Sequence, residues 1–308
     1  MTSRPDALRV GTRRSALAMA QSGGVAATIL ALLGREVELV EITTRGDVDA
    51  TALTQIGGTG VFVTALRDAL YDGRIDLAVH SLKDLPTAPA DGLLIAAIPP
   101  REDPRDALCH PGGLTLGELP SGTRVGTGSP RRMAQLAALG LGVVLVPIRG
   151  NVDTRLKKAI DGIDVDAVVL ARAGLARLER LDAISEVIDP LQMLPAPGQG
   201  ALALECRAAD TELVALLAIL DDPDSRVCVE AERSLLAMLE AGCLAPVGAL
   251  ADVADDEIYL RAVVAAVDGS DTLRRSLTGP VDDPVGLGRR LAAILLEDGA
   301  AELLGTAR

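Results

Sequence analysis

The feature of this sequence that most limits its possible folds is a strand, a basic turn and a helix that occur twice. The first copy runs from a short predicted strand at residues 8–11 through Thr12-Arg13-Arg14-Ser15 into an amphipathic segment that ends near residue 33. The second copy runs from residues 124–126 through a turn that holds Pro130, Arg131 and Arg132 into a segment that ends near residue 139. The N-terminus of a helix offers unpaired N–H groups and a partial positive charge, so both turns are candidate anion-binding sites.

Further apolar runs alternate with helical segments along the chain. Strands are predicted at residues 37–42, 75–81, 93–98, 143–147, 166–171 and 201–206, and helices at 61–71 and after the strands that end at residues 147 and 171. This alternation is typical of α/β proteins with a mostly parallel sheet. Because ligands bind beyond the carboxyl ends of parallel strands, we expect the functional side chains at those ends.

Proline-rich breaks predict the domain organisation. The breaks at 99–104 and 194–200 bracket the second copy of the pattern, so the chain would leave one domain at the first break and return at the second. Such a double crossing is the architecture of clamshell binding proteins, and a third break at Asp221-Asp222-Pro223 precedes a helix, a hairpin and a closing helix. We therefore expect an α/β fold with domain 1 formed by residues 1–99 and 200–219, an inserted domain 2 by 105–194, and a small α+β domain 3 by 223–308.

The charge distribution favours a small anionic ligand. The net charge of −13 argues against a nucleic-acid partner, and Trp is absent, so a base-stacking platform is not expected. Between residues 124 and 158 the balance is inverted, with one acidic residue, Asp153, among basic residues. The basic residues of this stretch are Arg124, Arg131, Arg132, Arg149, Arg155, Lys157 and Lys158.

The N-terminal residues and the cysteines predict the cellular compartment and argue against some kinds of site. Residues 1–8 are polar, and no run approaches the roughly 18 apolar residues that span a bilayer, so we expect a cytoplasmic protein without a membrane partner. The cysteines, at positions 109, 206, 228 and 243, show no short paired spacing, and the histidines, at 80 and 110, lie far from any cysteine pair. Neither a metal site nor a disulfide framework is expected.

A lysine and a carboxylate follow the predicted strand at 75–81. Lys83 and Asp84 precede Leu85-Pro86, and Lys83 is one of only three lysines against 27 arginines. A solvated turn is the alternative interpretation, because charged residues before proline are common in loops. The strand-end position nevertheless favours Asp84 as a catalytic candidate.

One cysteine stands apart from the other three. Cys243 follows Gly242, and glycine is common just past the end of a helix, here the one predicted at 224–240. Cys228 instead shares that helix with apolar neighbours. A thiol on such a loop is more accessible than one in a helix or strand, and the thiolate is the reactive form of cysteine. Cys243 is therefore a candidate for covalent chemistry, with inert packing as the alternative.

Eight motifs together resemble the porphobilinogen deaminase family, also called hydroxymethylbilane synthases, and the resemblance covers essentially the whole chain. The motifs are Thr12-Arg13-x-Ser15, Thr44-Arg45-Gly46-Asp47, His80 to Pro86, Arg101 to Asp106, Ser129-x-Arg131-Arg132, Arg149-Gly150-Asn151, Gly198-Gln199-Gly200-Ala201 and Gly242-Cys243. The resemblance implies two domains similar to type II periplasmic binding proteins and a third that carries a dipyrromethane cofactor on Cys243. It implies a monomeric enzyme of tetrapyrrole biosynthesis that joins four porphobilinogen molecules, releases ammonia and hydrolyses off the linear product.

The resemblance also implies a role for each site residue. Asp84 would stabilise the positive charge that develops as ammonia leaves the substrate, a task that suits a fixed carboxylate. The cofactor would be bound by Cys243, Lys83, Ser129, Arg131, Arg132, Arg149 and Asp47, and the substrate by Arg13, Ser15, Arg155, Arg177, Phe62 and Gln199. The planar guanidinium group meets a carboxylate with two parallel hydrogen bonds, which explains why arginine dominates this set.

The chain departs from the family pattern at a few positions. Thr59, in the loop at 48–60, and Thr64 stand where the family frequently has lysine, and Gly128 replaces a frequent serine. A non-enzymatic clamshell that binds anions is the rival hypothesis, but it leaves Asp84 and Cys243 without a task. A nucleotide-binding transferase is a second rival, but the turn at 126–131 lacks the lysine of a phosphate-binding loop.

Overall fold

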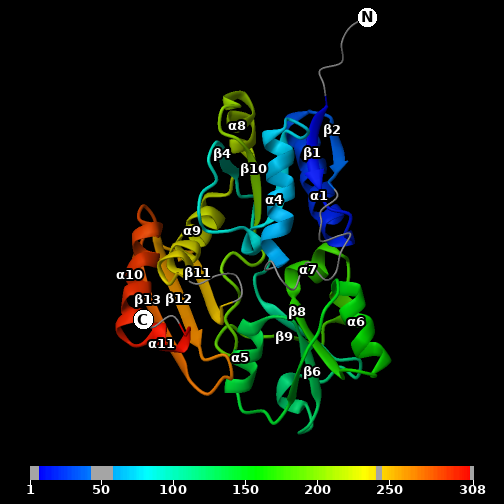
Figure 1. Ribbon diagram of the computed structural model, residues 1–308, viewed down its shortest axis with the longest axis vertical. Coiled ribbons are helices and arrows are strands. Elements are labelled where there is room, and N and C mark those ends of the chain that lie inside the picture. Colours follow the sequence, from blue (N-terminus) through cyan, green and yellow to red (C-terminus); the bar gives the residue numbers. More distant parts are fainter. Residues whose placement is uncertain (1–6, 43–57, 241–244, 306–308) are drawn as a thin grey trace, which may run out of the picture. The chain divides into compact units, whose positions relative to one another are not determined.

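The chain divides into two compact units. The computed structural model describes residues 7–42, 58–240 and 245–305, with the backbone alone for residues 58–62 (Figure 1). The first unit holds Met1–Arg101 and Ala201–Ser225, and the second holds Glu102–Gly200 and Arg226–Arg308. The chain therefore leaves the first unit at residue 101, returns to it at residue 201, and enters the second unit again at residue 226.

The first unit is built on a five-stranded sheet with the order β2-β1-β3-β10-β4. Its strands are β1 (Leu8–Thr12), β2 (Val37–Glu41), β3 (Leu77–Ser81), β4 (Leu93–Ala97) and β10 (Leu202–Arg207). Strand β1 pairs in parallel with β2 and β3, whereas β10 runs antiparallel between β3 and β4. Because β10 is antiparallel to both of its neighbours, the other strands all point the same way and share one carboxyl edge.

Helices cover this sheet and supply much of its core. They are α1 (Ala16–Leu33), α4 (Gly58–Tyr71) and α8 (Thr211–Leu217), with short 3-10 turns η1 (Leu82–Asp84) and η4 (Ala218–Leu220). Val25 and Ile29 of α1 pack in one cluster with Val10 of β1 and Leu204 of β10. The side chain of Ser15 caps α1 by accepting a hydrogen bond from Ala18 N, which satisfies one of the free N–H groups at the helix start.

Helix α1 corrects the expectation that no segment of this chain is long and apolar enough to span a bilayer. It is 18 residues long with a mean hydropathy of 1.7, so by length and composition alone it could cross a membrane. Gln21 and Ser22 interrupt the apolar run without lowering its average enough to fail this test. A core helix of a soluble protein passes the same test, and α1 places Val25 and Ile29 in the core of the first unit.

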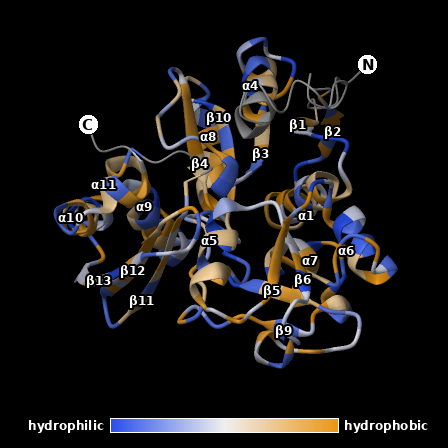
Figure 2. Cartoon of the chain, turned by 60° about the horizontal axis from the view of Figure 1, so that its bottom comes forward, coloured by the Kyte–Doolittle hydropathy of each residue, from blue (hydrophilic) through white to orange (hydrophobic). Residues whose placement is uncertain are grey.

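The second unit contains a five-stranded sheet with the order β7-β6-β8-β5-β9. Its strands are β5 (Asp106–Cys109), β6 (Arg124–Thr127), β7 (Val144–Pro147), β8 (Ala167–Ala171) and β9 (Glu186–Val187). Strand β6 pairs in parallel with β7 and β8, and β5 runs antiparallel to β8. All four residues of β5 are buried, and Figure 2 shows the largely hydrophobic colouring of this strand.

The helices of this sheet follow its parallel strands. They are α5 (Pro130–Ala138) after β6, α6 (Val152–Asp161) after β7 and α7 (Arg172–Arg177) after β8, with 3-10 turns η2 (Leu116–Glu118) and η3 (Leu181–Ala183). Ser129 caps α5 and Asn151 caps α6, each with its side-chain oxygen. The helix starts therefore gather at the carboxyl edge of β6, β7 and β8.

The rest of the second unit is a three-stranded antiparallel sheet packed against helices. The sheet consists of β11 (Val247–Ala254), β12 (Glu257–Ala265) and β13 (Thr272–Pro280), and the helices are α9 (Pro223–Met238), α10 (Pro284–Glu297) and α11 (Ala300–Leu303). Leu235 of α9, Leu260 of β12 and Leu291 of α10 are fully buried in one cluster, and Figure 1 shows α10 alongside β13. This part is the predicted small α+β domain.

The predicted fold class is confirmed. The structure has two α/β sheets with the same strand relations, the second inserted in the sequence of the first, and a small C-terminal α+β part. Three strands were missed: β5, whose four residues include Asp106, the two-residue β9, and β11, whose alanine-rich sequence lacks a strong strand signal. The antiparallel direction of β10 was also not foreseen. It follows from the return of the chain from the inserted segment.

Candidate active site

Asp84 lies in a pocket at the carboxyl edge of the first unit's sheet. It ends η1, directly after β3, and its side chain is half-buried. The pocket has a volume of about 210 Å³ and is lined by Arg13, Ala18, Gln21, Val63, Leu66, Val79, His80, Ser81 and Asp84. Both charged turns singled out in the sequence, after β1 and after β3, therefore contribute to one cavity. Lys83 is half-buried beside Asp84 in η1.

A buried ion-pair network holds His80, one of the residues that line this pocket. His80 Nε2 lies 3.1 Å from Glu205 Oε2, and Arg67 Nη2 donates to Glu205 Oε1 at 2.8 Å. Burial alone would raise the pKa of Glu205, but the hydrogen bonds and charges of His80 and Arg67 lower it below its usual value. The network fixes the His80 ring at the pocket wall. Gln21 Nε2 fixes Ser81 in a similar way by donating to its Oγ at 2.8 Å.

The basic turn after β1 has the predicted arrangement. Thr12 is buried at the end of the strand, Arg13 is half-buried and lines the pocket, and Ser15 caps α1. The two turns that resemble each other in sequence therefore also resemble each other in structure, because Ser129 caps α5 in the same way. Assignments of Arg13 and Ser15 to substrate binding stay predictions.

Two arginines of the second unit are more deeply buried than the sequence indicates. Arg131 and Arg132, at the start of α5, are only 3% and 5% exposed. Both pair with Asp106 at the start of β5, through Arg131 Nη2 at 2.8 Å from Oδ2 and Arg132 Nη2 at 2.8 Å from Oδ1. Because β5 is antiparallel to β8, its first residue lies at the same edge as the helix starts. The predicted carboxylate-binding pair thus already has a carboxylate partner within the protein.

The ionised form of Asp106 is strongly favoured. Full burial would raise the pKa of this carboxyl, but the two arginine charges and the hydrogen bonds from Arg132 and Gln199 outweigh it and lower the pKa to about 2. Gln199 Nε2 donates to Asp106 Oδ1 at 2.7 Å and to the Pro104 carbonyl oxygen at 2.7 Å. The predicted site residue Gln199 therefore contacts the arginine pair through Asp106.

The other basic residues of this edge differ in exposure and in partners. Arg149, after β7, is exposed, and Arg155 and Arg177, in α6 and α7, are half-buried. Arg177 Nη2 donates to the Gly200 carbonyl oxygen at 2.6 Å. The pKa of Arg155 is lowered by burial and by the nearby charge of Arg132, and its buried Nε has no hydrogen-bond partner among the residues that the structure describes.

The positive charge at this edge is therefore only partly neutralised. Arg131 Nε is also buried without a hydrogen-bond partner in the described part of the chain. Asp106 is a single carboxylate shared by two guanidinium groups. An arrangement of this kind suits a ligand that brings several carboxylates.

The three cysteines that the structure describes are buried. Cys109, Cys206 and Cys228 are each at most 7% exposed. Burial raises the pKa of Cys109 to about 12 and that of Cys206 to about 11, which disfavours their thiolates. Cys243, Asp47 and the side chain of Phe62, which the sequence placed in the site, lie outside the described residues.

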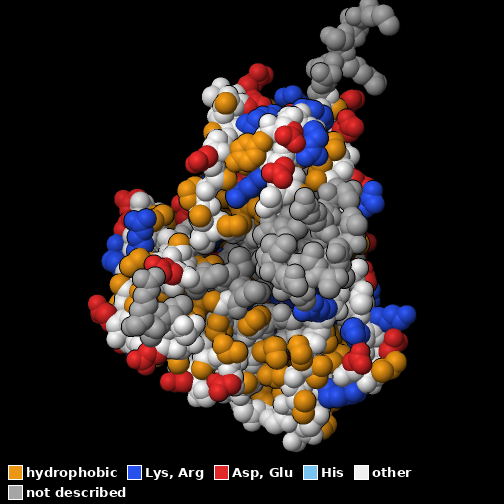
Figure 3. All heavy atoms as spheres, in the orientation of Figure 1, with side chains coloured by type: hydrophobic (Ala, Val, Ile, Leu, Met, Phe, Trp, Pro, Cys, Tyr) orange, Lys and Arg blue, Asp and Glu red, His pale blue; other side chains and the backbone are white. Residues whose placement is uncertain are grey.

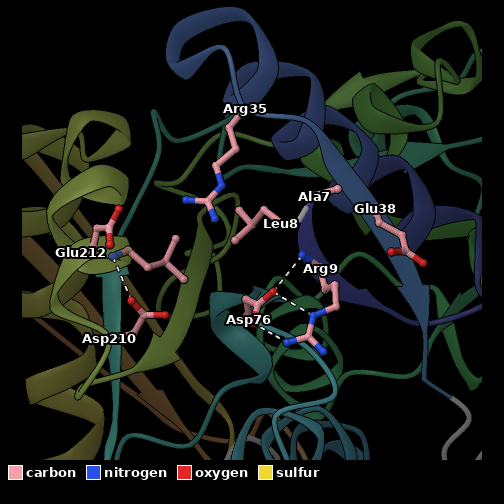
Figure 4. Close-up of a pocket in the computed structure, with 9 residues that line it drawn as sticks. Ala7, Leu8, Arg9, Arg35, Glu38, Asp76, Asp210 and Glu212 are labelled. Carbon is pink, nitrogen blue, oxygen red and sulfur yellow. Dashed lines mark hydrogen bonds and ion pairs between the residues drawn. The ribbon is translucent and has the colours of Figure 1, made fainter. Parts of the chain in front are cut away.

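A larger pocket lies at the opposite edge of the first unit's sheet. It has a volume of about 650 Å³ and is lined by Ala7, Leu8, Arg9, Arg35, Glu38, Asp76, Asp210, Glu212 and Leu213 (Figure 4). Arg9 pairs with Asp76, and acidic side chains outnumber basic ones in the lining. Figure 3 likewise shows charges of both signs interspersed over this unit. The smaller pocket is the better candidate for the functional site, because it lies beyond the carboxyl ends of the strands, where ligands bind in open α/β sheets.

Sequence reasoning gave no role to three buried acids. Asp106 belongs to one of the family motifs, but nothing in the sequence showed that it faces the arginine pair. Glu205 interrupts an otherwise apolar strand, and Glu232 lies on the predicted helix α9. A charged residue within an apolar run is the one available signal, since buried charges are almost always paired.

The fold and the two sets of site residues define a class of protein. It has two α/β sheets and a small C-terminal sheet, with a pocket that holds a carboxylate in the first unit and a partly neutralised cluster of arginines in the second. Comparisons with known proteins identify the family. The model described as porphobilinogen deaminase, dipyromethane cofactor binding domain, matches residues 8–215, and that described as porphobilinogen deaminase, C-terminal domain, matches residues 226–297. The chain belongs to the porphobilinogen deaminase family.

Curated relatives agree along nearly the whole chain. Porphobilinogen deaminase 1 of Streptomyces avermitilis is 59% identical over 317 residues, covering 97% of this chain and 98% of its own. The porphobilinogen deaminase of Nocardia farcinica is 57% identical, covering 96% and 88%, and that of Mycobacterium tuberculosis is 55% identical, covering 96% and 98%. The resemblance inferred from the sequence motifs is confirmed, and the non-enzymatic alternative is not favoured.

Solved structures show weaker likeness. The methionine binding protein MetQ aligns with a TM-score of 0.42 at 13% identity, covering 70% of this chain and 90% of its own. The periplasmic aliphatic sulphonate binding protein SsuA from Escherichia coli aligns with a TM-score of 0.39 at 12% identity, covering 96% and 88%. The fold class stated above depends on the strand order and pairing of the two sheets and not on these alignments.

Proposed function

We propose that this protein joins four porphobilinogen molecules head to tail on a covalently bound dipyrromethane primer, releases one ammonia for each unit, and hydrolyses off hydroxymethylbilane. The observation that carries the proposal is the cluster of Arg131, Arg132 and Arg155, which a single carboxylate, Asp106, only partly neutralises. Each pyrrole unit brings an acetate and a propionate, so negative charge accumulates as the chain grows. An edge with surplus guanidinium charge suits such a product.

The residues of this edge fit the family's cofactor. The buried Nε atoms of Arg131 and Arg155 have no hydrogen-bond partner among the described residues, and both belong to cations that can bind carboxylates. We assign Ser129, Arg131, Arg132 and Arg149 to the carboxylate groups of the cofactor. When bound, the dipyrromethane supplies the primer to which the pyrrole units are added. Cys243, Lys83 and Asp47 complete the proposed cofactor set.

Asp84 is the proposed catalytic residue. The departure of ammonia from the aminomethyl group leaves a positive charge on the substrate, and a preorganised carboxylate lowers the free energy of that charge in the transition state. The half-buried position of Asp84 in a pocket of about 210 Å³ supports this role, because water competes less with the carboxylate there. Its carboxylate can also accept hydrogen bonds from pyrrole N–H groups.

The remaining site residues are proposed to bind the substrate. Arg13 lines the Asp84 pocket, and Arg155 and Arg177 lie half-buried at the basic edge of the second unit. Ser15, Phe62 and Gln199 complete the set. The structure adds a constraint for Gln199, because its amide nitrogen already donates to Asp106 and to the Pro104 carbonyl oxygen. Its contribution is therefore most direct through Asp106.

We further propose that the protein works as a cytoplasmic monomer of three domains, with no nucleic-acid or membrane partner. The net charge of −13 supports the first exclusion, because phosphate backbones are repelled over long distances. The packing of α1 against its own sheet supports the second. Light scattering of the purified protein measures the oligomeric state directly, and a dimer at micromolar concentration would contradict the monomer.

Two measurements on the purified wild-type protein test the activity. Incubation with porphobilinogen is expected to consume four molecules for each tetrapyrrole released and to liberate four ammonia. The intact mass is expected to exceed that of the polypeptide by a dipyrrole. A protein that binds porphobilinogen without consuming it would be a clamshell receptor, and the proposed activity would be wrong.

A further inference from the structure

Asp106 is the meeting point of three side chains in the second unit. Its carboxylate is fully buried at the start of β5. Oδ1 accepts hydrogen bonds from Arg132 Nε at 3.0 Å, Arg132 Nη2 at 2.8 Å and Gln199 Nε2 at 2.7 Å, and Oδ2 lies 2.8 Å from Arg131 Nη2. One carboxylate therefore fixes two guanidinium groups and one amide.

Each guanidinium group is also held from a second direction. Arg131 Nη1 donates to the Leu194 carbonyl oxygen at 2.5 Å, and Arg132 Nη1 donates to the Val169 carbonyl oxygen at 3.0 Å. Two contacts on different nitrogens fix the plane of a guanidinium group, which a single contact does not. The orientation of both arginines is thus set by the protein before any ligand binds, and preorganisation of this kind reduces the entropy lost on binding.

The charge of this cluster is unbalanced. Two guanidinium groups share one carboxylate, and Arg155, whose pKa is lowered in part by the Arg132 charge, lies near them. The pKa of Asp106 is about 2, so the carboxylate remains ionised at neutral pH. Asp106 therefore reduces the repulsion between the arginines without cancelling their attraction for an anionic ligand.

Backbone contacts connect this cluster to the C-terminal part of the unit. Gln199 follows Gly198, whose N–H donates to Glu232 Oε2 at 2.6 Å. Glu232 is fully buried on α9, and its Oε1 accepts from Ala251 N at 2.9 Å in β11. The segment that carries Gln199 is thus fixed against α9 and β11, and this holds the Gln199 amide in place on Asp106.

We propose that Asp106 is a positioning residue for carboxylate binding, and that it holds Arg131 and Arg132 in the orientation that receives the acetate and propionate groups of the pyrroles. Gln199 acts through Asp106 by holding its carboxylate. The inference depends on the proposed function. A purely structural ion pair is the alternative, and it predicts lower stability without a change in affinity.

The first test is Asp106→Asn, which keeps the shape of the side chain and removes its charge. In molecules that carry the dipyrrole, KM for porphobilinogen is expected to rise about ten- to a hundredfold. The loss of one correctly placed hydrogen bond to a charged group weakens binding by about this factor. The catalytic constant is expected to fall less than tenfold, because Asp84 is untouched. The fraction of molecules that carry the dipyrrole, measured by intact mass, is also expected to fall. Unchanged KM with full loading would overturn the proposal.

The matched control is Asp166→Asn. Asp166 is also a carboxylate of the second unit with a pKa of about 2, and it pairs with Arg124 at the opposite edge of the same sheet. The substitution removes the same charge and one ion pair, so KM and loading are expected to stay within about twofold of wild type. A tenfold increase of KM in this control would mean that net charge, not positioning, sets the affinity, and would overturn the proposal.

A second variant keeps the test decisive if Asp106→Asn does not fold. Gln199→Leu retains both ion pairs and removes one donor to Asp106, so KM is expected to rise about three- to tenfold. Where both single variants fold, the double variant that combines Asp106→Asn and Gln199→Leu is expected to have the same KM as Asp106→Asn alone, because both substitutions act through one carboxylate. The proposal would be overturned by a Gln199→Leu protein with wild-type KM. It would also be overturned by a double variant in which the increase of KM is the product of the two single increases.

The failure of this inference is distinguishable from failure of the proposed function. If wild-type protein lacks a dipyrrole mass and consumes no porphobilinogen, the function is wrong and the inference falls with it. If wild-type protein is loaded and active while Asp106→Asn and Gln199→Leu bind porphobilinogen as tightly, the function stands and the inference alone is wrong.

Discussion

The His80 imidazole lies 3.1 Å from the Glu205 carboxylate on a neighbouring strand, and the two residues are only 5% and 2% exposed. They belong to β3 and β10, the antiparallel pair that forms as the chain returns to the first unit. His80 also lines the pocket that holds Asp84. A contact between residues 125 positions apart in the sequence therefore joins the pocket wall to the returning strand.

Substitution of Glu205 by Gln is expected to destabilise the protein. It removes the acid that neutralises Arg67 and pairs with His80, and breaking a buried ion pair by removing one partner costs about 3–5 kcal/mol. Chemical denaturation at pH 7 measures the free energy of unfolding. The control is Asp72→Asn, which removes an exposed partner of Arg74 and is expected to cost less than about 1 kcal/mol. Equal effects of the two substitutions would contradict the importance of the buried pair.

The same carboxylate predicts a pH dependence. The pKa of folded Glu205 is lowered relative to the unfolded chain, so its contribution to stability is fully present above the unfolded pKa of about 4.3. It is lost progressively as the pH falls through the folded pKa. The stability difference between wild type and Glu205→Gln is therefore expected to shrink between pH 6 and pH 3. A constant difference over this range would contradict the lowered pKa.

Substitution of Arg155 by Met is expected to separate binding from stability. Arg155 has no ion-pair partner among the residues that the structure describes, and burial together with the Arg132 charge lowers its pKa, so its charge destabilises the folded state. We expect Arg155→Met to keep or raise the melting temperature while KM for porphobilinogen rises about tenfold or more. Thermal unfolding and steady-state kinetics on the same preparation check both parts. A lower melting temperature with unchanged KM would make Arg155 a structural residue.

The sequence predicts the elements of this fold better than it predicts the partners of the site residues. The basic turns after β1 and β6, and Asp84 after β3, could be placed at strand ends because turn chemistry and helix starts are local features. The pairing of Arg131 and Arg132 with Asp106 depends on β5 running antiparallel beside β8, a non-local relationship that periodicity does not encode. Burial of the pair could therefore not be foreseen, nor could the contact of His80 with Glu205.

Cys243→Ala is expected to abolish the covalent cofactor. The described cysteines are buried, and the pKa values of Cys109 and Cys206 are raised to about 12 and 11, so neither is suited to attack an electrophilic pyrrole. The variant is expected to show the bare polypeptide mass and no pyrrole colour with an acidic aldehyde reagent. Cys228→Ala, in the core beside Leu235, is the control and is expected to keep the dipyrrole. A dipyrrole mass on the Cys243→Ala protein would refute the assignment.

Asp84 is the residue whose charge the chemistry is expected to need most. Asn keeps the shape and one acceptor but removes the negative charge, so Asp84→Asn isolates the electrostatic contribution. The loss of a preorganised electrostatic partner costs about 3–4 kcal/mol of barrier, or about a hundred- to a thousandfold in rate. Folding and cofactor attachment are expected to survive, because Asp84 is half-buried and lies in a three-residue 3-10 turn.

The measurement is the single-turnover rate of porphobilinogen addition, after intact mass confirms that each variant carries the dipyrrole. Asp84→Glu keeps the charge but moves it by one methylene, so it is expected to be faster than Asp84→Asn and well below wild type, since small displacements of a catalytic group are costly. An Asn variant within about threefold of wild type corresponds to less than about 1 kcal/mol of barrier. That result would return Asp84 to the interpretation of a solvated turn, and His80 would then be the next titratable group of the same pocket to test.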